Sequence, residues 1–508
     1  MQRSAVIDMG SNSFRLVVYQ YVPDSWWALA DEIREATRVS AGMGEHGALL
    51  PEPMDRAIHT AAVFASFLRA SGVERVDAVA TSAIRDATNR DELLDAVQRH
   101  TGLEVRVISG AEEAWYGYVA IANSTTVRDG FGIDMGGGSV QLMRIADRRL
   151  AEAESLRLGA VHISEQFLPN EEATPKQLKR LGKHVTRTLT ELEWWDADQG
   201  ARLVGLGGTI RNLATAVQRR LELTDVDVQG WRLERDALEQ LIEDLAARPA
   251  SKRGSVRGIK PDRGDVILGG AAVVAAAMDH GGFDTLEVTE AGLREGMFLE
   301  RLLKGRNPPL FTNVRRASVE SLARRFRTDD VHVNHVAALS LELFDDLREA
   351  KLHTLDAGDR ELLWAACLLH DIGVTIDYDD HHRHSHYLIL HAGLPGFDPR
   401  ELKLIALIAR WHRKGDPDPS ELGALARAGD RERLSLLCGI VRLAEQLERS
   451  RDQTVTGVEL ERAGDVLRIR TLIAAGADPS VAIWAAQRSS GLLAQAIGSP
   501  VEVVATGR

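Results

Sequence analysis

Residues 133–139 read Ile-Asp-Met-Gly-Gly-Gly-Ser, and residues 7–13 repeat the same order of residue types as Ile-Asp-Met-Gly-Ser-Asn-Ser. Each stretch ends an apolar run with a carboxylate and continues with glycine and small polar residues. Glycines let backbone N–H groups approach a phosphate closely, and a carboxylate at a strand end can hold a divalent cation. Both stretches lead into a second apolar run, at residues 14–19 and 140–145. The repeat therefore predicts two related strand–turn–strand lobes that face one cleft.

Two further stretches place hydrogen-bond donors after apolar runs. Residues 203–210 turn on glycine into a helical pattern, and a helix N-terminus behind glycines is an anion site. Residues 81–86 read Thr-Ser-Ala-Ile-Arg-Asp, so two hydroxyl groups and an arginine are placed to hold phosphate oxygens. For that stretch, a helix N-cap by Thr81 or Ser82 is an interpretation of equal weight.

A basic segment spans residues 252–263, although the whole chain has a formal net charge of -12. The overall negative charge argues against general nucleic-acid binding. A local basic patch in such a chain predicts a track for a polyanionic substrate, and a solvated loop is the alternative. The basic residues of this polyanion track are Lys252, Arg253, Arg257, Lys260 and Arg263.

The pattern of the chain changes near Asn307-Pro308-Pro309. Alternating strand and helix patterns precede this point, amphipathic helical patterns follow it to about Arg449, and short strand patterns return after Asp452. A chain of 508 residues is expected to form roughly three to four domains, and we place the main boundary at the two prolines. Most of the 16 histidines lie in the helical region.

The two cysteines, Cys367 and Cys438, lie in apolar helical patterns and are expected to be buried thiols. They do not suggest a disulfide framework, no secretory signal pattern precedes Asp8, and the longest apolar run is too short to span a bilayer. We therefore expect a cytoplasmic protein that does not associate with membranes.

Seven stretches occur in a characteristic order: VIDMGSNSFRLVVY from residue 6, VATSAIRDATNRDEL from 79, ISGAEEAWYGY from 108, GIDMGGGSVQL from 132, LRLGAVHISEQF from 156, GLGGTIRNLA from 205 and RGIKPDRGDVILGGA from 257. Together they resemble the exopolyphosphatase and guanosine pentaphosphate phosphohydrolase (Ppx/GppA) family, and the resemblance covers nearly the whole chain. These stretches are specific at the level of the family and leave the choice between the two substrates open.

The resemblance implies the fold of the actin–sugar kinase–Hsp70 superfamily, an α/β fold with two ribonuclease-H-like lobes and the active site in the cleft between them. The expected domains are a first lobe at 1–125, a second lobe at 126–306, an all-α domain at 310–450 and a small α/β domain at 451–508. A closing helix at 291–304 is expected to pack back on the first lobe. The family also implies a homodimer.

The family's activity implies release of terminal orthophosphate from inorganic polyphosphate by Mg²⁺-assisted attack of water, with pppGpp as a second candidate substrate. By resemblance Glu113 acts on the attacking water, with Glu112 as the fallback, although two carboxylates in a first helical turn commonly only favour the helix dipole. Asp8 and Asp134 are the expected Mg²⁺ ligands. The expected phosphate-binding residues are Gly10, Ser11, Asn12, Ser13, Ser82, Arg85, Gly136, Gly137, Gly138, Ser139, Gly207, Gly208 and Thr209.

One residue departs from the family pattern. After the glycines the family usually has Ser-Thr-Glu, whereas this chain has Ser139-Val140-Gln141, so an expected carboxylate is an amide. This substitution keeps open an alternative function, a catalytically weak sensor that binds (p)ppGpp, although the retained Glu113 and Asp134 favour catalysis. A third interpretation is an ATP-dependent kinase of the same superfamily, for which no second-substrate block is recognisable.

The helical region resembles the HD phosphohydrolase superfamily. The sequence Leu-His-Asp-Ile-Gly supplies the pair His370 and Asp371, His335 is the expected upstream histidine, and Glu445 occupies the place of the usual last aspartate. Imidazole and carboxylate together suit Mn²⁺, Fe or Zn²⁺ better than Mg²⁺, so these four residues are candidate ligands of a second divalent metal. A scaffold whose histidines are merely hydrogen-bonded is the alternative. The candidate outer members of the site are His386 and His412.

Overall fold

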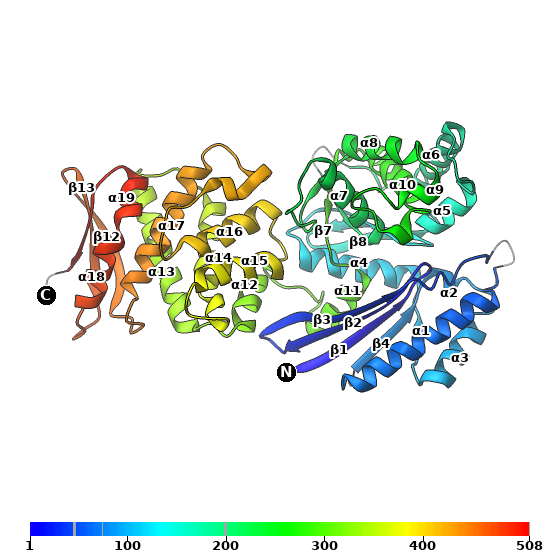
Figure 1. Cartoon of the computed structure of the whole chain (residues 1–508), viewed down its shortest axis with the longest axis horizontal. Helices are drawn as coiled ribbons and strands as arrows, with labels where there is room; N and C mark the ends of the chain where they lie inside the picture. Colours follow the sequence, from blue (N-terminus) through cyan, green and yellow to red (C-terminus); the bar gives the residue numbers. More distant parts are fainter. Residues whose placement is uncertain (44–46, 74, 198–200, 507–508) are drawn as a thin grey trace. The chain divides into compact units, whose positions relative to one another are not determined.

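The computed structural model describes residues 1–43, 47–73, 75–197 and 201–506. The chain forms two compact units, unit 1 (Met1–Val314) and unit 2 (Arg315–Arg508), whose elements are labelled in Figure 1. Within the described ranges, no helix combines the length and the apolar character needed to cross a membrane.

The first sheet of unit 1 is built around the strand that carries Asp8. In the described residues its order is β3-β2-β1-β4-β5; β2 is antiparallel to β1 and β3, and β4 runs parallel to β1 and β5. Apolar side chains such as Phe14 and Phe64 form a core between the sheet and helices α1 and α3. The elements are β1 (Gln2–Met9), β2 (Phe14–Val22), β3 (Trp26–Glu35), α1 (Pro51–Ala70), β4 (Arg75–Ala80), α2 (Ser82–Arg85), α3 (Arg90–Thr101) and β5 (Val105–Val107).

The second sheet repeats this plan around the strand that carries Asp134. Its order in the described residues is β10-β11-β9-β6-β7-β8; β6, β7 and β8 are antiparallel, and β9 lies parallel between β6 and β11. The predicted α/β class with two related lobes is therefore confirmed. The elements are β6 (Gly130–Met135), β7 (Val140–Ala146), β8 (Arg149–Leu156), α5 (Ala160–Phe167), α6 (Pro175–Leu189), β9 (Arg202–Leu206), α7 (Gly208–Arg220), β10 (Arg232–Glu234), α8 (Arg235–Ala246), α9 (Ala250–Arg253), η1 (Pro261–Arg263), α10 (Ile267–His280) and β11 (Thr285–Val288).

Two helices connect the sheets of unit 1, α4 (Gly110–Ser124) and α11 (Leu293–Leu302), and they pack against each other. Helix α11 also contacts the first sheet, where the Tyr19 hydroxyl donates to Glu295 over 2.9 Å. The ring of Tyr19 stacks on Phe298 with the ring centroids 4.0 Å apart. Helix α11, the last helix of unit 1, therefore packs against both α4 and the first sheet.

Unit 2 combines helices with a small sheet of order β12-β13-β14 in its described residues. One hydrophobic core joins them, because Val455 and Ile469 of the sheet belong to the same buried cluster as Leu363 and Leu443 of the helices. The helices of this region and the C-terminal strands form one compact unit. The elements are α12 (Val314–Arg325), α13 (Asp330–Glu349), α14 (Ala357–Leu369), η2 (Ile372–Thr375), α15 (His381–Ala392), α16 (Pro399–Trp411), η3 (Pro419–Leu425), α17 (Asp430–Leu447), β12 (Val455–Ala463), β13 (Val466–Ile473), α18 (Ser480–Ser489), α19 (Gly491–Ile497) and β14 (Val501–Ala505).

Both cysteines are free and buried, as predicted. They lie in the helices of unit 2, Cys367 in α14 and Cys438 in α17. Burial raises the pKa of each thiol to about 12, so neither has the thiolate character that a reactive cysteine requires.

Candidate active site

The two Asp-Met-Gly turns of unit 1 meet in one cavity, which we call the cleft. Asp8 lies near the end of β1 and Asp134 near the end of β6, and each strand turns through glycine into the next antiparallel strand. The cleft is also lined by Glu113 of α4, by the glycine turn before α7 and by the first turn of α11. The sheets thus bring together groups that are far apart in the sequence.

Burial and mutual repulsion raise the pKa of the carboxyl groups of the cleft. The pKa of Asp134 is raised to about 6, mainly by burial; Arg211 opposes this shift, and the charge of Asp8 adds to it. Burial also raises the pKa of Asp8 above its ordinary value. Oxygen donors that repel one another in this way favour a bound cation, and carboxylates are the ligands that Mg²⁺ prefers. The expected Mg²⁺ ligands therefore fit such an ion.

Helix α4 separates the roles of its two glutamates. Its N-cap is Ser109, whose hydroxyl accepts from the Glu112 backbone N–H, while the Glu112 carboxylate accepts from the Ser109 backbone N–H over 2.8 Å. Glu112 also pairs with Arg106. Its carboxylate is thus used in a capping box, whereas the next residue, Glu113, is buried and lines the cleft.

Both oxygens of the Glu113 carboxylate are held. Arg85 Nη1 contacts Oε1 at 2.5 Å, and the amide nitrogen of Gln141 donates to Oε2 over 2.6 Å. The pKa of Glu113 is raised to about 7, mainly by burial; Arg85 opposes this shift, and Asp134 and Asp8 add to it. The group therefore combines a fixed position with a pKa close to neutrality.

Gln141, the residue that departs from the family pattern, lies inside this network. Its side-chain nitrogen is also 2.8 Å from Ser139 Oγ and 3.0 Å from Ser155 Oγ. The side chain of Gln141 is buried. Gln141 lies directly opposite Asp134 in the antiparallel pair of β6 and β7. The amide thus supplies a donor to Glu113 at the place where the family usually has a second carboxylate.

Four arginines line the cleft, and only Arg263 among them is a binding residue predicted from the sequence. Burial and the charges of neighbouring arginines lower the pKa of Arg15 to about 9. Two buried donors, Arg263 Nε and Asn12 Nδ2, have no hydrogen-bond partner in the described structure. Crowded positive charge and unpaired donors favour an anionic ligand. The four arginines are Arg15, Arg211, Arg263 and Arg294.

Of the predicted phosphate-binding residues, most line the cleft. Arg85 instead pairs with Glu113, Thr209 is buried behind the turn, and Gly138 lies against Ser82 and Ser11. The predicted members that line the cleft are Gly10, Ser11, Asn12, Ser13, Ser82, Gly136, Gly137, Ser139, Gly207 and Gly208.

The polyanion track divides into different environments. Arg263 lines the cleft. Arg253 is buried and its Nε donates to the carbonyl oxygens of Leu245 and Arg248, at 2.9 and 3.1 Å. Its guanidinium holds the C-terminal end of α8, so Arg253 does not belong to the track. The exposed members are Lys252, Arg257 and Lys260.

The profile of the Ppx/GppA phosphatase family matches residues 17–305, more than half of the chain. The chain belongs to this family. The profile of domain III of the Ppx/GppA phosphatases matches residues 314–472. The Aquifex aeolicus member of the Ppx/GppA family is similar in structure, with 30% sequence identity, a TM-score of 0.52, and coverage of 60% of this chain and 98% of its own.

Two further relatives extend the comparison. A guanosine-5'-triphosphate,3'-diphosphate pyrophosphatase of Vibrio vulnificus is 28% identical over 472 residues, which cover 92% of this chain and 91% of the relative. An exopolyphosphatase of Cytophaga hutchinsonii has a TM-score of 0.56 at 24% identity, and covers 59% of this chain and 98% of its own. The second relative supports the fold alone.

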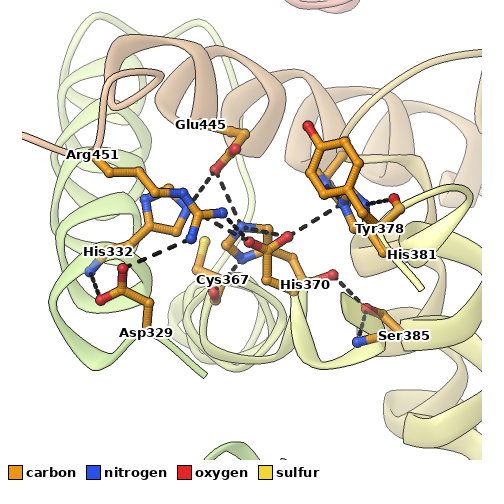
Figure 2. Close-up of polar contacts among 12 residues, drawn as sticks. Asp329, His332, Cys367, His370, Tyr378, His381, Ser385, Glu445 and Arg451 are labelled. Atoms are coloured by element: carbon orange, nitrogen blue, oxygen red, sulfur yellow. Dashed lines mark hydrogen bonds and ion pairs between the residues drawn. The ribbon is translucent and has the colours of Figure 1, made fainter. Parts of the chain in front are cut away.

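The predicted metal ligands of unit 2 form a separate cluster, which we call the histidine cluster. Figure 2 shows His332, His370 and Glu445 pointing toward one another. The structure corrects one predicted member: His335 Nε2 donates to the Val455 carbonyl oxygen over 2.7 Å, and His332 of the same helix takes its place in the cluster. The residues of the cluster are His332, His370, Asp371, His381, His412 and Glu445.

Proposed function

We propose that the cleft hydrolyses phosphoanhydride bonds and releases terminal orthophosphate from inorganic polyphosphate, with pppGpp as a second candidate substrate. The observation that carries the proposal is Glu113, a buried carboxylate with a pKa near 7 beside Asp8 and Asp134. A general base is most effective when its pKa lies near the working pH. The family membership supports a phosphatase, and the four arginines support a polyanionic substrate.

Substrate binding in this proposal uses backbone and side-chain donors together. The turns at residues 10–13, 136–139 and 207–208 offer backbone N–H groups to phosphate oxygens, as glycine-rich turns do. Arg15, Arg211, Arg263 and Arg294 offer positive charge. Asp8 and Asp134 would hold Mg²⁺, which would neutralise charge on the phosphate oxygens.

In the hydrolytic step, a water oxygen attacks the terminal phosphorus, and the bond from that phosphorus to the bridging oxygen breaks. Glu113 takes one proton from the water, and the shortened chain leaves with its charge on the bridging oxygen. Arg85 and Gln141 hold the two oxygens of Glu113, so the base does not have to reorient during the step. Phosphoryl transfer depends mainly on such positioning and on charge stabilisation.

The sensor alternative rests on Gln141, and the geometry argues against it. An amide that displaced the base from the cleft would support loss of catalysis, whereas Gln141 donates to Glu113 and leaves it in the cleft. The Vibrio relative is named for a guanosine pentaphosphate substrate and the Cytophaga relative for polyphosphate. The preference between these substrates is therefore a question for assay.

The deciding experiment measures phosphate release with Mg²⁺ from long-chain polyphosphate, pppGpp and ATP at equal phosphate concentration. We expect release from polyphosphate, and release from pppGpp if the nucleotide is also accepted. Tight binding of (p)ppGpp without release from either substrate would support the sensor. Consumption of ATP that requires a second acceptor would support the kinase.

A further inference from the structure

A second cavity of unit 1 lies beside the cleft, and we call it the outer cavity. It is lined by residues of α2 and α5 and has a volume of 650 Å³, whereas the volume of the cleft is 140 Å³. Its lining includes the exposed residues Asp86, Arg157, Glu165 and Gln166, so it opens to solvent. A water molecule in the liquid occupies about 30 Å³. The outer cavity therefore has room for a hydrated phosphate ion.

A thin wall of small residues separates the outer cavity from the cleft. Ser11 and Ser82 line both cavities, and their hydroxyl oxygens lie 3.1 Å apart. Gly138 completes the wall, because a Cβ atom added at this glycine would lie 2.4 Å from Ser82 Oγ and 3.0 Å from Ser11 Oγ. A single neutral hydrogen bond contributes little net free energy. Rotation of the two serine side chains would therefore join the two cavities.

The segments that form this wall also hold the proposed base. Ser139, which follows Gly138 in the chain, donates to Glu113 Oε2 over 3.3 Å. Arg85, which contacts the other carboxylate oxygen of Glu113, belongs to the short helix that begins at Ser82. In the proposed hydrolysis, orthophosphate consequently forms beside the wall.

The two cavities differ in charge. In the described structure none of the four cleft arginines lines the outer cavity. The outer cavity has instead the guanidinium of Arg157 together with the carboxylates of Asp86 and Glu165. Burial and the nearby charge of Arg157 lower the pKa of His162, so this lining residue is neutral at pH 7. A polyanion is thus held on the arginine side of the wall, and a small anion is held only weakly on the other side.

A long substrate blocks the arginine side for the product. After each cleavage the shortened chain still lies between the new orthophosphate and the end of the cleft where the chain enters. The volume of the cleft is 140 Å³, so orthophosphate cannot pass a chain that fills it. The ion must either wait for the whole chain to dissociate or leave on the opposite side.

We propose that the outer cavity is the release path for orthophosphate and that Ser11, Ser82 and Gly138 form its gate. This path rests on the proposed hydrolysis in the cleft. In each cycle the two serine side chains rotate apart, orthophosphate passes into the outer cavity, and the chain advances by one phosphate toward Glu113. Product release limits the turnover of many enzymes, so the gate would control kcat for long chains.

The test blocks the outer cavity with a bulky label on an introduced cysteine. Gln166→Cys places a thiol at an exposed lining position of the full-length protein. Burial raises the pKa of the native thiols of Cys367 and Cys438 to about 12, so the new thiol is the reactive one. One sample receives a small methylthio group and the other a bulky fluorescein maleimide. The matched control is Lys176→Cys with the same two labels, since Lys176 is exposed on α6 and is not part of the described lining of either cavity.

Orthophosphate release with Mg²⁺ is measured from long-chain polyphosphate and from tripolyphosphate. With the bulky label in Gln166→Cys, we expect kcat to fall about tenfold for the long chain and less than about twofold for tripolyphosphate, because release then limits turnover. The short product of tripolyphosphate can leave the cleft and free the entrance. Acid quench of the long-chain reaction should show a burst of about one orthophosphate per site, because cleavage precedes the blocked release. The methylthio form and both forms of Lys176→Cys should behave like the wild type.

Several results would overturn the release path. Equal kcat for the two labelled forms of Gln166→Cys would show that orthophosphate leaves elsewhere. Equal losses for both substrates without a burst would assign the effect of the label to cleavage. Weaker binding of pppGpp with unchanged long-chain turnover would assign the outer cavity to the nucleoside. If the wild type itself releases no orthophosphate from either substrate, the proposed function fails, and the release path fails with it.

Discussion

The cleft of unit 1 and the histidine cluster of unit 2 balance buried charge in different ways. In the cleft, three carboxyl groups face four arginines, and all the candidate cation ligands are oxygens. In the histidine cluster, imidazole nitrogens whose opposite edge is fixed by backbone carbonyls surround two carboxylates. Oxygen donors suit Mg²⁺ and imidazoles suit transition metals. The surplus of arginine in the cleft is suited to a polyanion, whereas the histidine cluster is suited to the ions themselves.

The largest expected effect is the loss of phosphate release when Glu113 of the cleft is replaced. Glu113→Gln keeps the size of the side chain but replaces one carboxylate oxygen by an amide nitrogen and removes the base. We expect phosphate release from polyphosphate to fall by roughly 10²–10⁴-fold, the usual contribution of general-base catalysis, with polyphosphate binding retained. Glu112→Gln is the control, since that carboxylate caps α4 and is expected to leave activity near wild type. Equal losses in both variants would contradict the division of roles.

The pH dependence of the wild type gives the next largest effect. Glu113 must be deprotonated to accept a proton, and burial raises its pKa to about 7. The deprotonated fraction falls about tenfold for each pH unit below the pKa, so kcat/KM at pH 5 should be about 10²-fold below its plateau. An acid limb of the kcat/KM profile centred near pH 4.5, the ordinary pKa of glutamate, would contradict the argument that burial raises the pKa of Glu113.

A histidine could also produce a limb near neutral pH, and Gln141→Glu separates the two explanations. The new carboxylate would face Glu113, at a place where the amide nitrogen is now 2.6 Å from Oε2. Two carboxylates in such contact share a proton, so the upper pKa of the pair rises. We expect the limb to move upward by about one unit and kcat/KM at pH 6 to fall about tenfold.

Two controls accompany the Gln141→Glu profile. Gln141→Met removes the donor without adding charge, and it should shift the limb less than Gln141→Glu does. His335→Ala should leave the limb unchanged, because it alters a histidine of unit 2 that has no place in the cleft. A limb that does not move in Gln141→Glu would show that another group controls the profile.

The residues that can be predicted from the sequence are those whose signal is local. Asp8 and Asp134 could be placed because an apolar strand, an aspartate and glycines follow one another directly in the chain. Arg211 and Arg294 were missed, since they belong to the first turns of α7 and α11 and only the packing of those helices brings them to the cleft. Local composition alone carries no such information.

Other residues have roles that depend on contacts formed only in the folded protein. His332 and His335 both lie on α13, and the apolar pattern of that helix does not tell which of the two faces His370. The charged neighbours of Arg253 in the sequence indicate a basic track, yet its guanidinium donates to carbonyl groups at the C-terminal end of α8. Hydrogen bonds to the backbone decided both cases, and these depend on the tertiary structure.

The smallest expected effect concerns the exposed members of the polyanion track, Arg257 and Lys260. Burial and the charges of Arg34 and Arg15 lower the pKa of Lys260, so this lysine lies close to the positive charge of the cleft. We expect the double variant Arg257→Gln, Lys260→Gln to weaken binding of long-chain polyphosphate about 2- to 5-fold, because exposed ion pairs contribute little each. Tripolyphosphate should be affected less, since a short chain can be held inside the cleft.

Salt dependence and a matched variant test this last prediction. The Debye length is about 8 Å at physiological ionic strength, so the difference between the double variant and the wild type should shrink as salt is added. Lys176→Gln, Lys179→Gln removes the same charge from exposed positions on α6 that do not line the cleft, and it should bind both substrates like the wild type. Equal losses for long and short chains would mean that these residues support the fold of the loop. If the track acts through charge, the loss of binding should instead be larger for longer chains and smaller at higher salt concentration.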